Sequence, residues 1–266
     1  YETDDPDWET VLDFDKLASD EDKNWVFKGS ECYRPAGQTS YKCMISLSDG
    51  GKDAIIRREF DLVSKRFVED GFISAEAKQG SAWAGPDTLL IATDWGEGTR
   101  TESGYPFIVK RWQRGTPLEF ADEVFRGKET DVGVWPLTLE VSNGRILQGA
   151  AEAETFFTTR YWWFPDGEST PVQWPIPLKA DLEGIYQGQV LVSLKQDWTP
   201  AGQADGFTSG DLVAFDVETF ISTRKLPHVS LVFHPEETQA LESVGISKDV
   251  ILLQVSDTAI GKIYRV

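Results

Sequence analysis

Large aromatic residues recur at a nearly constant spacing along most of the chain, each toward the end of an alternating apolar segment. They are Trp112, Phe164, Phe215 and Tyr264, and successive members are 52, 51 and 49 residues apart. A period of roughly 40 to 50 residues that contains several short strands is typical of β-propellers, in which each repeat is one small radial sheet. The repeat therefore predicts an all-β fold made of four-stranded blades.

The segments around these aromatic residues keep the same phase in each repeat. Apolar runs of strand length follow short polar turns, as expected for the second strand of a blade. These runs are TLLIAT (88–93), RILQGAA (145–151), QVLVSL (189–194) and VILLQVS (250–256). Small and apolar residues precede the same turns in SAWA, VGVW, LEGI and SVGI, and they suit innermost strands at a crowded axis. Outermost strands are predicted at 122–126, 171–175 and 229–234.

A looser first copy occupies residues 24–60, where a DGG turn separates two apolar runs. Before it, Trp8–Phe14 has the pattern of a lone outer strand, and a short polar helix is predicted at 17–23. The count is about five blades in a single propeller domain over residues 1–266. An ordinary β-sandwich is the alternative fold, since short strands at regular spacing fit it too.

The last blade stops after its third strand at Val266. A blade without its outer strand exposes a row of unpaired backbone groups. Either the Trp8–Phe14 strand completes this blade and closes the ring, or the natural protein continues. We expect the second outcome, in which the chain is part of a longer protein.

The chain is strongly acidic, with 44 Asp and Glu residues against 26 Lys and Arg and a formal net charge of −18. Such a surface repels nucleic acid and anionic membranes, so we expect neither as a partner. No apolar run approaches the roughly 18 residues that a membrane-spanning helix needs. The acidity favours solubility first of all, and the sequence does not choose between cytoplasm and periplasm.

The only two cysteines, Cys32 and Cys43, flank the segment YRPAGQTSY. They could meet across a hairpin as a disulfide or remain free thiols, and the sequence leaves both alternatives open. A zinc site is not expected, because only His228 and His234 could add to this widely spaced pair.

Signatures of hydrolytic chemistry are absent from the sequence. It contains no G-x-S-x-G motif, no H-E-x-x-H motif and no Gly-rich phosphate loop before a helix. His228 and His234 flank one predicted outer strand, have no apparent Ser or Cys partner, and are expected at the surface. We therefore expect no catalytic residue, no metal and no cofactor in this chain.

The loops between second and third strands would share one face of a propeller, and they carry acidic and aromatic side chains. One such loop, DWGEGTRTESG, follows the predicted strand TLLIAT, and the next predicted strand begins at Tyr105. The corresponding loops of the other blades are assigned as SECYRPAGQTS, EAETF, KQDWTPAGQADGFTSG and SDTAIG. The candidate substrate-facing residues are Asp94, Trp95, Glu97, Glu102, Glu152, Glu154, Asp197 and Trp198.

These residues have more than one interpretation. Tryptophan offers a large contact area at low entropic cost, which suits ligand binding. In the packing alternative, each Trp lies under its own loop and caps the end of its blade. Carboxylate pairs in such a ring could also serve glycoside hydrolysis, which needs two carboxyl groups about 5 to 10 Å apart, or could bind calcium. Because acidic residues are abundant here, the last two patterns are unspecific.

Several long segments resemble a known family. They are NWVFKG (24–29), REFDLVSKRFVEDGF (58–72), SGYPFIVKRWQRGTPL (103–118) and SLKQDWTPAG (193–202). In this order they are similar to the propeller domain of bacterial prolyl oligopeptidase-like serine peptidases. The resemblance implies a propeller, usually of seven blades, stacked on an α/β-hydrolase domain that bears the catalytic Ser, Asp and His. With about five blades and no hydrolase domain, this chain would be a partial seven-bladed propeller.

The resemblance also implies a non-catalytic function: gating and orienting peptide substrates for a hydrolase domain outside this chain. In the family, the ends of second strands face that domain. The matching positions here are Asp94 and Trp95, Ala151 and Glu152, and Asp197 and Trp198. Where the family carries a substrate-binding arginine after a second strand, this chain has Ala151 or Glu152, so that contact is not expected to carry over.

Two other functions stay open. A self-contained propeller could bind a glycan or a protein ligand, and it would pair Trp8–Phe14 beside the terminal segment GKIYRV to close its ring. A propeller glycoside hydrolase would instead depend on carboxylates such as Asp94 and Glu152.

Overall fold

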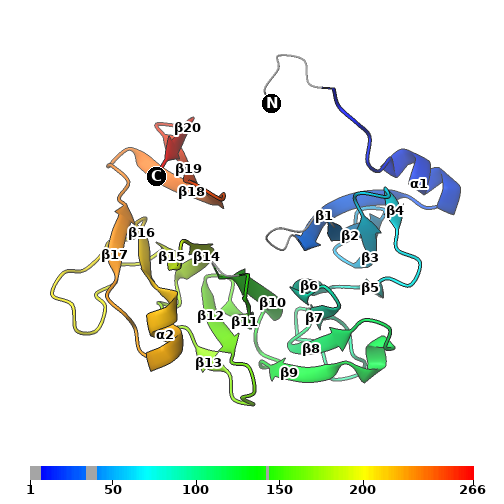
Figure 1. Ribbon diagram of the computed structural model, residues 1–266, viewed down its shortest axis with the longest axis horizontal. Coiled ribbons are helices and arrows are strands. Elements are labelled where there is room, and N and C mark those ends of the chain that lie inside the picture. Colours follow the sequence, from blue (N-terminus) through cyan, green and yellow to red (C-terminus); the bar gives the residue numbers. More distant parts are fainter. Residues whose placement is uncertain (1–6, 34–40, 142–143) are drawn as a thin grey trace.

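The computed structural model describes residues 7–33, 41–141 and 144–266, and it contains five antiparallel sheets that follow one another along the chain. Figure 1 shows the sheets placed around an open arc, with the first blade (blue) and the last (red) at its two ends. The first strands of successive sheets contact one another and so line the inside of the arc. This is a β-propeller arrangement of five blades, which confirms the prediction from the aromatic repeat.

Each blade is an antiparallel meander. Blade 1 contains β1 (Trp25–Tyr33), β2 (Lys42–Asp49) and β3 (Ile55–Asp61), with β4 (Arg66–Phe67) and β5 (Ile73–Ala77) both paired to β3. Blade 2 contains β6 (Gly80–Gly85), β7 (Thr88–Ala92), β8 (Ile108–Gln113) and β9 (Asp122–Arg126). Blade 3 contains β10 (Gly133–Glu140), β11 (Ile146–Thr155), β12 (Thr158–Phe164) and β13 (Val172–Gln173).

The remaining two blades follow the same order. Blade 4 contains β14 (Ala180–Tyr186), β15 (Gln189–Leu194), β16 (Leu212–Asp216) and β17 (Ser230–Phe233). Blade 5 contains β18 (Gln239–Ile246), β19 (Ile251–Asp257) and β20 (Ile260–Arg265). Three short helices complete the described chain: α1 (Phe14–Glu21), η1 (Leu118–Phe120) and α2 (Val217–Thr223). Neither α-helix of the described chain has the length or the apolar character needed to cross a membrane.

The second strand of an inner blade is largely apolar where a neighbouring blade packs on each of its two faces. In β7, Leu89, Leu90 and Ile91 are fully buried, although they point alternately to opposite faces of the sheet. Close packing also dictates a small residue in β11. A Cβ at Gly149 would lie 2.1 Å from the carbonyl oxygen of Trp162, so only glycine allows this approach of the two strands.

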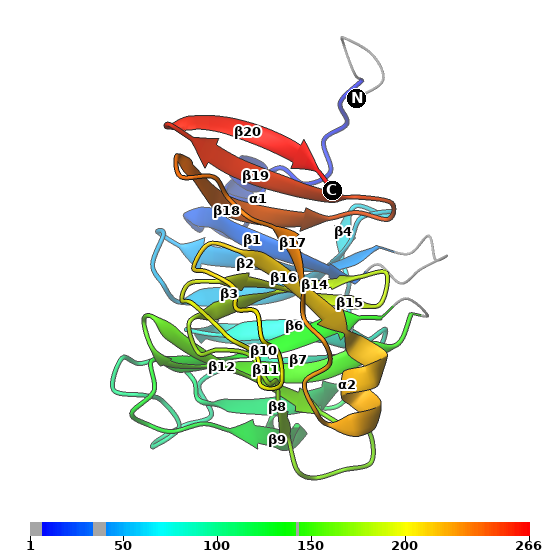
Figure 2. The same ribbon diagram turned by 90° about the vertical axis from the view of Figure 1, so that its left-hand side faces the viewer.

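Seen from the side, the antiparallel strands of all blades lie along roughly the same axis (Figure 2), so the connections between them collect on two opposite faces. We call the face with the connections between second and third strands the loop face; its segments are 50–54, 93–107, 156–157, 195–211 and 258–259. We call the opposite face the turn face; it includes the described turns 86–87, 114–121, 187–188 and 247–250. The predicted site belongs to the loop face.

The predicted outer strand at Trp8–Phe14 is wrong. Residues 7–13 form no strand, and α1 begins where this strand was expected to end. The Asp13 carboxylate accepts a hydrogen bond from the backbone N–H of Lys16 at 2.9 Å, and this N-cap starts the helix. Phe14 and Leu17 then have helical spacing and pack against blade 1. In the described residues, β20 pairs with β19, so the strand pairing that a closed ring requires does not form.

The assignment of SECYRPAGQTS to the loop face is also wrong. Its described residues, 30–33, form the end of β1 and pair with the start of β2 at the turn face; its residues 34–40 lie outside the described part. The tight DGG turn connects β2 to β3 instead. Gly50 and Gly51 have φ values of 77° and 81°, which residues with a Cβ rarely adopt.

Candidate substrate-facing site

The loop face carries the predicted carboxylates on three separate blades. Asp94, Glu97 and Glu102 are exposed on the 93–107 loop of blade 2, and Asp197 is exposed on the 195–211 loop of blade 4. The Asp94 carboxylate accepts a hydrogen bond from the N–H of Gly96 at 2.9 Å and pairs with Arg100 at 3.4 Å. Asp197 accepts from the N–H of Ser209 at 2.9 Å. The described contacts of the Asp94 and Asp197 carboxylates therefore stay within their own loops.

Trp95 makes the contacts that the packing alternative predicts. Its indole N–H donates to the carbonyl oxygen of Ile108 at 3.1 Å, and its backbone N–H donates to the Thr99 hydroxyl at 3.0 Å. The ammonium group of Lys110 lies 4.2 Å from the ring centroid, in cation–π geometry. Trp95 thus joins the end of blade 2 to its own loop. Its substrate-facing role stays a prediction.

Trp198 holds the corresponding loop of blade 4 closed. Its backbone exchanges two hydrogen bonds with Phe207, at 2.9 and 2.8 Å, and the two rings lie 6.4 Å apart. Both side chains pack against the apolar core of blades 3 and 4. The contacts of Trp198 therefore also fit the capping interpretation.

Glu152 lies at the end of β11 but is buried, with 5% of its surface exposed. Its carboxylate accepts a hydrogen bond from the indole N–H of Trp162 at 2.9 Å. A second buried carboxyl group, that of Asp131, approaches it from the linker between blades 2 and 3, and a Cβ at Gly127 would contact both. Burial raises the pKa of Glu152, and the neighbouring Asp131 charge raises it further. Glu152 therefore belongs to an enclosed carboxyl pair.

Glu154 lies two residues further along β11 and is neutralised by cations. Its carboxylate lies 2.8 Å from the guanidinium of Arg160 and 3.6 Å from the ammonium of Lys128. Because Arg160 is the cross-strand partner of Glu152, the end of blade 3 places an arginine beside two glutamates. This is a positional feature that the spacing of the sequence did not predict.

Cys32 and Cys43 form a disulfide, so the structure decides between the two alternatives left open by the sequence. They are cross-strand partners in β1 and β2, and Cys43 is 1% exposed. The bridge therefore fastens the innermost two strands of blade 1 near the turn face.

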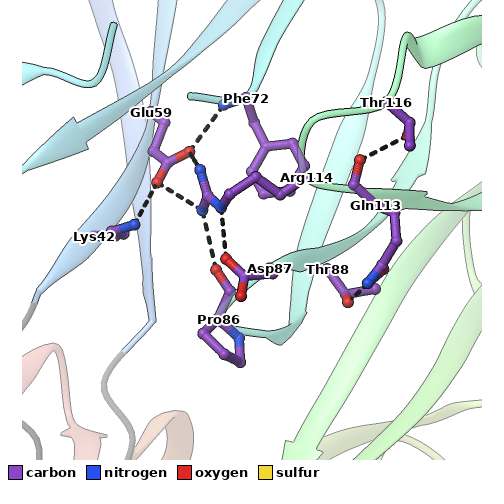
Figure 3. Close-up of polar contacts among 9 residues, drawn as sticks. All are labelled: Lys42, Glu59, Phe72, Pro86, Asp87, Thr88, Gln113, Arg114 and Thr116. Carbon is purple, nitrogen blue, oxygen red and sulfur yellow. Dashed lines mark hydrogen bonds and ion pairs between the residues drawn. The ribbon is translucent and has the colours of Figure 1, made fainter. Parts of the chain in front are cut away.

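A buried ion pair that the sequence analysis missed joins blades 1 and 2 (Figure 3). Glu59 of β3 is 1% exposed, and its two carboxylate oxygens accept hydrogen bonds from Arg114 at 2.8 and 2.9 Å. The backbone N–H of Phe72 donates to the same carboxylate at 2.8 Å, and Lys42 lies 3.5 Å away. Arg114 also pairs with Asp87 at 2.7 Å. Bidentate geometry and full desolvation of the carboxylate make this a strong, directional contact.

The same junction is completed by aromatic rings. The guanidinium of Arg114 lies 4.6 Å from the Phe72 ring centroid, and the Phe72 ring is 4.8 Å from that of Trp112. Glu59, Phe72, Trp112 and Arg114 come from 58–72 and 103–118, two of the segments that carry the family resemblance. The family-like segments therefore build a contact between blades on the turn face, away from the predicted site.

Two exposed aromatic residues on the loop face were also missed. Phe156 and Phe157 form the tip of the β11–β12 hairpin, and each is 81% exposed. The predicted loop of this blade, EAETF, ended at Phe156 and did not include Phe157. The pair of adjacent aromatic residues in TFFT could have indicated this tip. Neighbouring residues of a strand point to opposite faces, so the two rings could not both lie on the same face of the sheet.

Five radial antiparallel sheets define this molecule as a β-propeller domain. A model of the family described as "Prolyl oligopeptidase, N-terminal beta-propeller domain" matches residues 2–263. The chain is 35% identical over 258 residues to an uncharacterized peptidase of Sinorhizobium fredii, covering 96% of this chain and 35% of that protein. It is 26% identical over 276 residues to an uncharacterized peptidase of Rickettsia prowazekii, covering 99% of this chain and 37% of the relative.

Solved structures show the same fold. A post-proline cleaving enzyme from Rickettsia typhi matches with a TM-score of 0.84 at 24% identity, over 98% of this chain and 39% of that one. Oligopeptidase B from Leishmania major matches with a TM-score of 0.62 at 9% identity, over 96% of this chain and 33% of the other. The chain belongs to the prolyl oligopeptidase family, and it spans about a third of the length of the curated relatives it matches.

Proposed function

We propose that this chain gates and orients peptide substrates for an α/β-hydrolase catalytic domain carried by the same longer protein. The observation that carries the proposal is the family match, which covers nearly the whole chain with a model of the propeller domain alone. The bulk of each curated relative lies outside the matched region, which leaves room for a catalytic domain. On this proposal the partners are that hydrolase domain and a peptide.

The loop face supports the second half of the proposal. Exposed carboxylates on blades 2 and 4 and exposed aromatic rings on blade 3 give it polar and apolar groups that a peptide can contact. On the turn face, by contrast, the hydrogen bonds between Arg114 and Glu59 hold blades 1 and 2 together. Substrate contact is therefore assigned to the loop face, including Asp94, Glu97, Glu102 and Asp197.

Gating is tested in the longer protein by comparing cleavage of a short prolyl peptide with cleavage of a long unfolded polypeptide. We expect the short peptide to be strongly preferred, and the preference to fall when Glu59→Gln weakens the contact between blades 1 and 2. Glu218→Gln, which removes an exposed ion pair with Arg145 at 2.6 Å on the turn face, is the matched control and should leave the preference unchanged.

The proposal fails if removal of the whole propeller leaves the size preference intact. It also assigns no bond cleavage to this chain. We therefore expect the isolated 266-residue chain to leave a prolyl reporter uncleaved and to remain unlabelled by a fluorophosphonate probe, which reacts with activated serines. Labelling of a serine in this chain would contradict the assignment.

A further inference from the structure

A cavity of about 290 Å³ lies on the loop face between blades 3 and 4. The tip of the β11–β12 hairpin forms one wall. The other wall is formed by residues around the start of β14 and just after the end of β15. Its lining includes Phe156, Phe157, Leu178, Lys179, Asp181 and Lys195. An apolar wall thus faces a charged one in the same depression.

The frame of this cavity is held by backbone hydrogen bonds. The N–H of Thr159 donates to the carbonyl oxygen of Leu178 at 2.9 Å, which fastens blade 3 to the linker before blade 4. The N–H of Lys195 donates to the carbonyl oxygen of Lys179 at 2.8 Å. The hairpin tip is stiffened by the hydroxyl contact between Thr155 and Thr158 at 2.7 Å. Both walls are therefore preformed, as ligand sites usually are.

Within the described residues, neither of the two phenylalanine rings belongs to a hydrophobic cluster of the core. Each is 81% exposed at a two-residue hairpin tip, where polar residues and glycine are the usual choice. Exposed adjacent aromatic side chains supply contact area at low conformational cost, which is typical of binding surfaces. Their position on the cavity wall indicates an apolar group as the neighbour that covers them.

The charge of the cavity is opposite to that of the chain. Lys195 forms an ion pair with Asp181, whereas Lys179 is exposed and makes no ion pair within the part of the chain that the structure describes. Two lysines and one aspartate give the lining a net charge of +1, in a chain of net charge −18. A single anionic group is the complement of this arrangement.

From these observations we infer that the cavity binds the C-terminal carboxylate of a peptide whose last residue is apolar. The inference rests on the proposed function, in which the loop face meets peptides, and names the part of the peptide it holds. A terminal carboxylate and the last side chain sit on the same residue, so one small cavity can accept both. The carboxylate would pair with the Lys179 ammonium, and the last side chain would lie against Phe156 and Phe157.

The test is a binding titration on the isolated chain with an N-terminally labelled hexapeptide that ends in Phe, as the free acid and as the C-terminal amide. We expect the free acid to bind about tenfold more tightly than the amide, the factor of one charge-assisted contact. Lys179→Gln should remove that difference by weakening the free acid alone. The double variant Phe156→Ser/Phe157→Ser should weaken both peptides.

Matched controls come from the turn face. Lys248→Gln removes an exposed lysine there, and Phe120→Ser removes a 72% exposed ring; neither should change either affinity. A third peptide, amidated but with an internal Glu, tests a side-chain carboxylate as the ligand. The inference is overturned if this peptide binds like the free acid, if the amide equals the free acid, or if no peptide binds. The proposed gating stands or falls separately, by the cleavage experiment on the longer protein.

Discussion

The contact between blades 1 and 2 and the contact between blades 3 and 4 depend on different kinds of interaction. Blades 1 and 2 meet around the buried carboxylate of Glu59, which Arg114 binds through two hydrogen bonds. Blades 3 and 4 meet through a buried cluster of aromatic rings. In this cluster Trp174, from the linker between the blades, stacks on Phe220 of α2 at 4.7 Å, and both are at most 1% exposed.

The comparison shows two different effects on the fold. Apolar packing mainly adds stability, whereas a directional ion pair mainly fixes the relative positions of two blades. Apolar burial is non-directional, so the aromatic junction gains stability from area and tolerates small shifts of the rings. A bidentate ion pair fixes distance and angle but must offset a large desolvation cost. We therefore expect the aromatic junction to dominate the free energy of unfolding and the ionic junction to determine how blades 1 and 2 are oriented.

The largest expected effect comes from the aromatic junction. Trp174→Ala removes a ring that is 1% exposed and contacts both Phe215 and Phe220. The lost transfer free energy and the resulting cavity should lower the free energy of unfolding by about 3 to 5 kcal/mol. Denaturant unfolding followed by tryptophan fluorescence measures it, with the 73% exposed Trp8 changed to Ala as the matched control. A loss no larger than that of the control would contradict the role given to this ring.

The ionic junction should respond to the loss of one partner. Glu59→Gln leaves Arg114 with half of its charge partners and should cost about 2 to 3 kcal/mol, because the remaining desolvated charge is poorly compensated. Glu123→Gln breaks an exposed pair with Arg126 at 2.7 Å and should cost less than about 1 kcal/mol.

A double-mutant cycle separates the pair from its surroundings. If Glu59 and Arg114 act together, Glu59→Gln and Arg114→Gln combined should cost clearly less than the sum of the two single variants. Strict additivity would show that Arg114 is held mainly by Asp87 and the Pro86 carbonyl, with Glu59 contributing little.

The fold of this chain is well predicted from its sequence because the strand pattern repeats. The apolar runs 88–93, 189–194 and 250–256 coincide with β7, β15 and β19 almost to the residue. What interrupts the repeat was not predicted. Helix α2 follows β16 without a loop, since Asp216 ends the strand and its carboxylate caps the helix through the N–H of Thr219 at 2.7 Å. A capping residue inside an alternating pattern is a local signal that periodicity conceals.

The candidate site was less predictable, because burial of a polar residue is a tertiary property. Asp94 follows the second strand of blade 2 and Glu152 lies near the end of that of blade 3, yet one is exposed and the other is enclosed by Trp162 and the linker residue Asp131. Sequence spacing gives the blade and the face of each residue. It does not give the neighbours contributed by a linker or by an adjacent blade, and these neighbours decide whether a carboxylate can meet a ligand.

That enclosed carboxyl pair gives a smaller effect with the opposite sign. Burial and the nearby Asp131 raise the pKa of Glu152, so the native state holds its proton more tightly than the unfolded chain does. Linkage then makes stability fall as pH rises above about 4.5, the ordinary value for Glu, up to the native pKa. Glu152→Gln keeps an acceptor for Trp162 without this penalty.

We therefore expect Glu152→Gln to raise the free energy of unfolding by about 1 kcal/mol at neutral pH, and Tm by roughly 2 to 4 °C. The gain should shrink as pH falls below about 4.5, and it should be nearly absent at about pH 3.5, where the wild-type carboxyl is mostly protonated in both states. Glu154→Gln is the control: it loses the Arg160 contact and should not stabilise. Equal stabilisation at both pH values would rule out the linkage explanation and point to relief of general negative charge.

The smallest expected effect belongs to the loop face itself. Asp94→Asn and Asp197→Asn change exposed side chains whose hydrogen-bond acceptors survive in the amide, so each should shift the free energy of unfolding by less than about 0.5 kcal/mol. A thermal melt of each variant checks this. If the loop face serves peptides and the junctions serve stability, these variants should alter peptide cleavage by the longer protein while leaving the melt unchanged. A clear loss of stability would mean that Asp94 or Asp197 holds its loop in place. That residue would then contribute to stability, contrary to the assignment of stability to the junctions between blades.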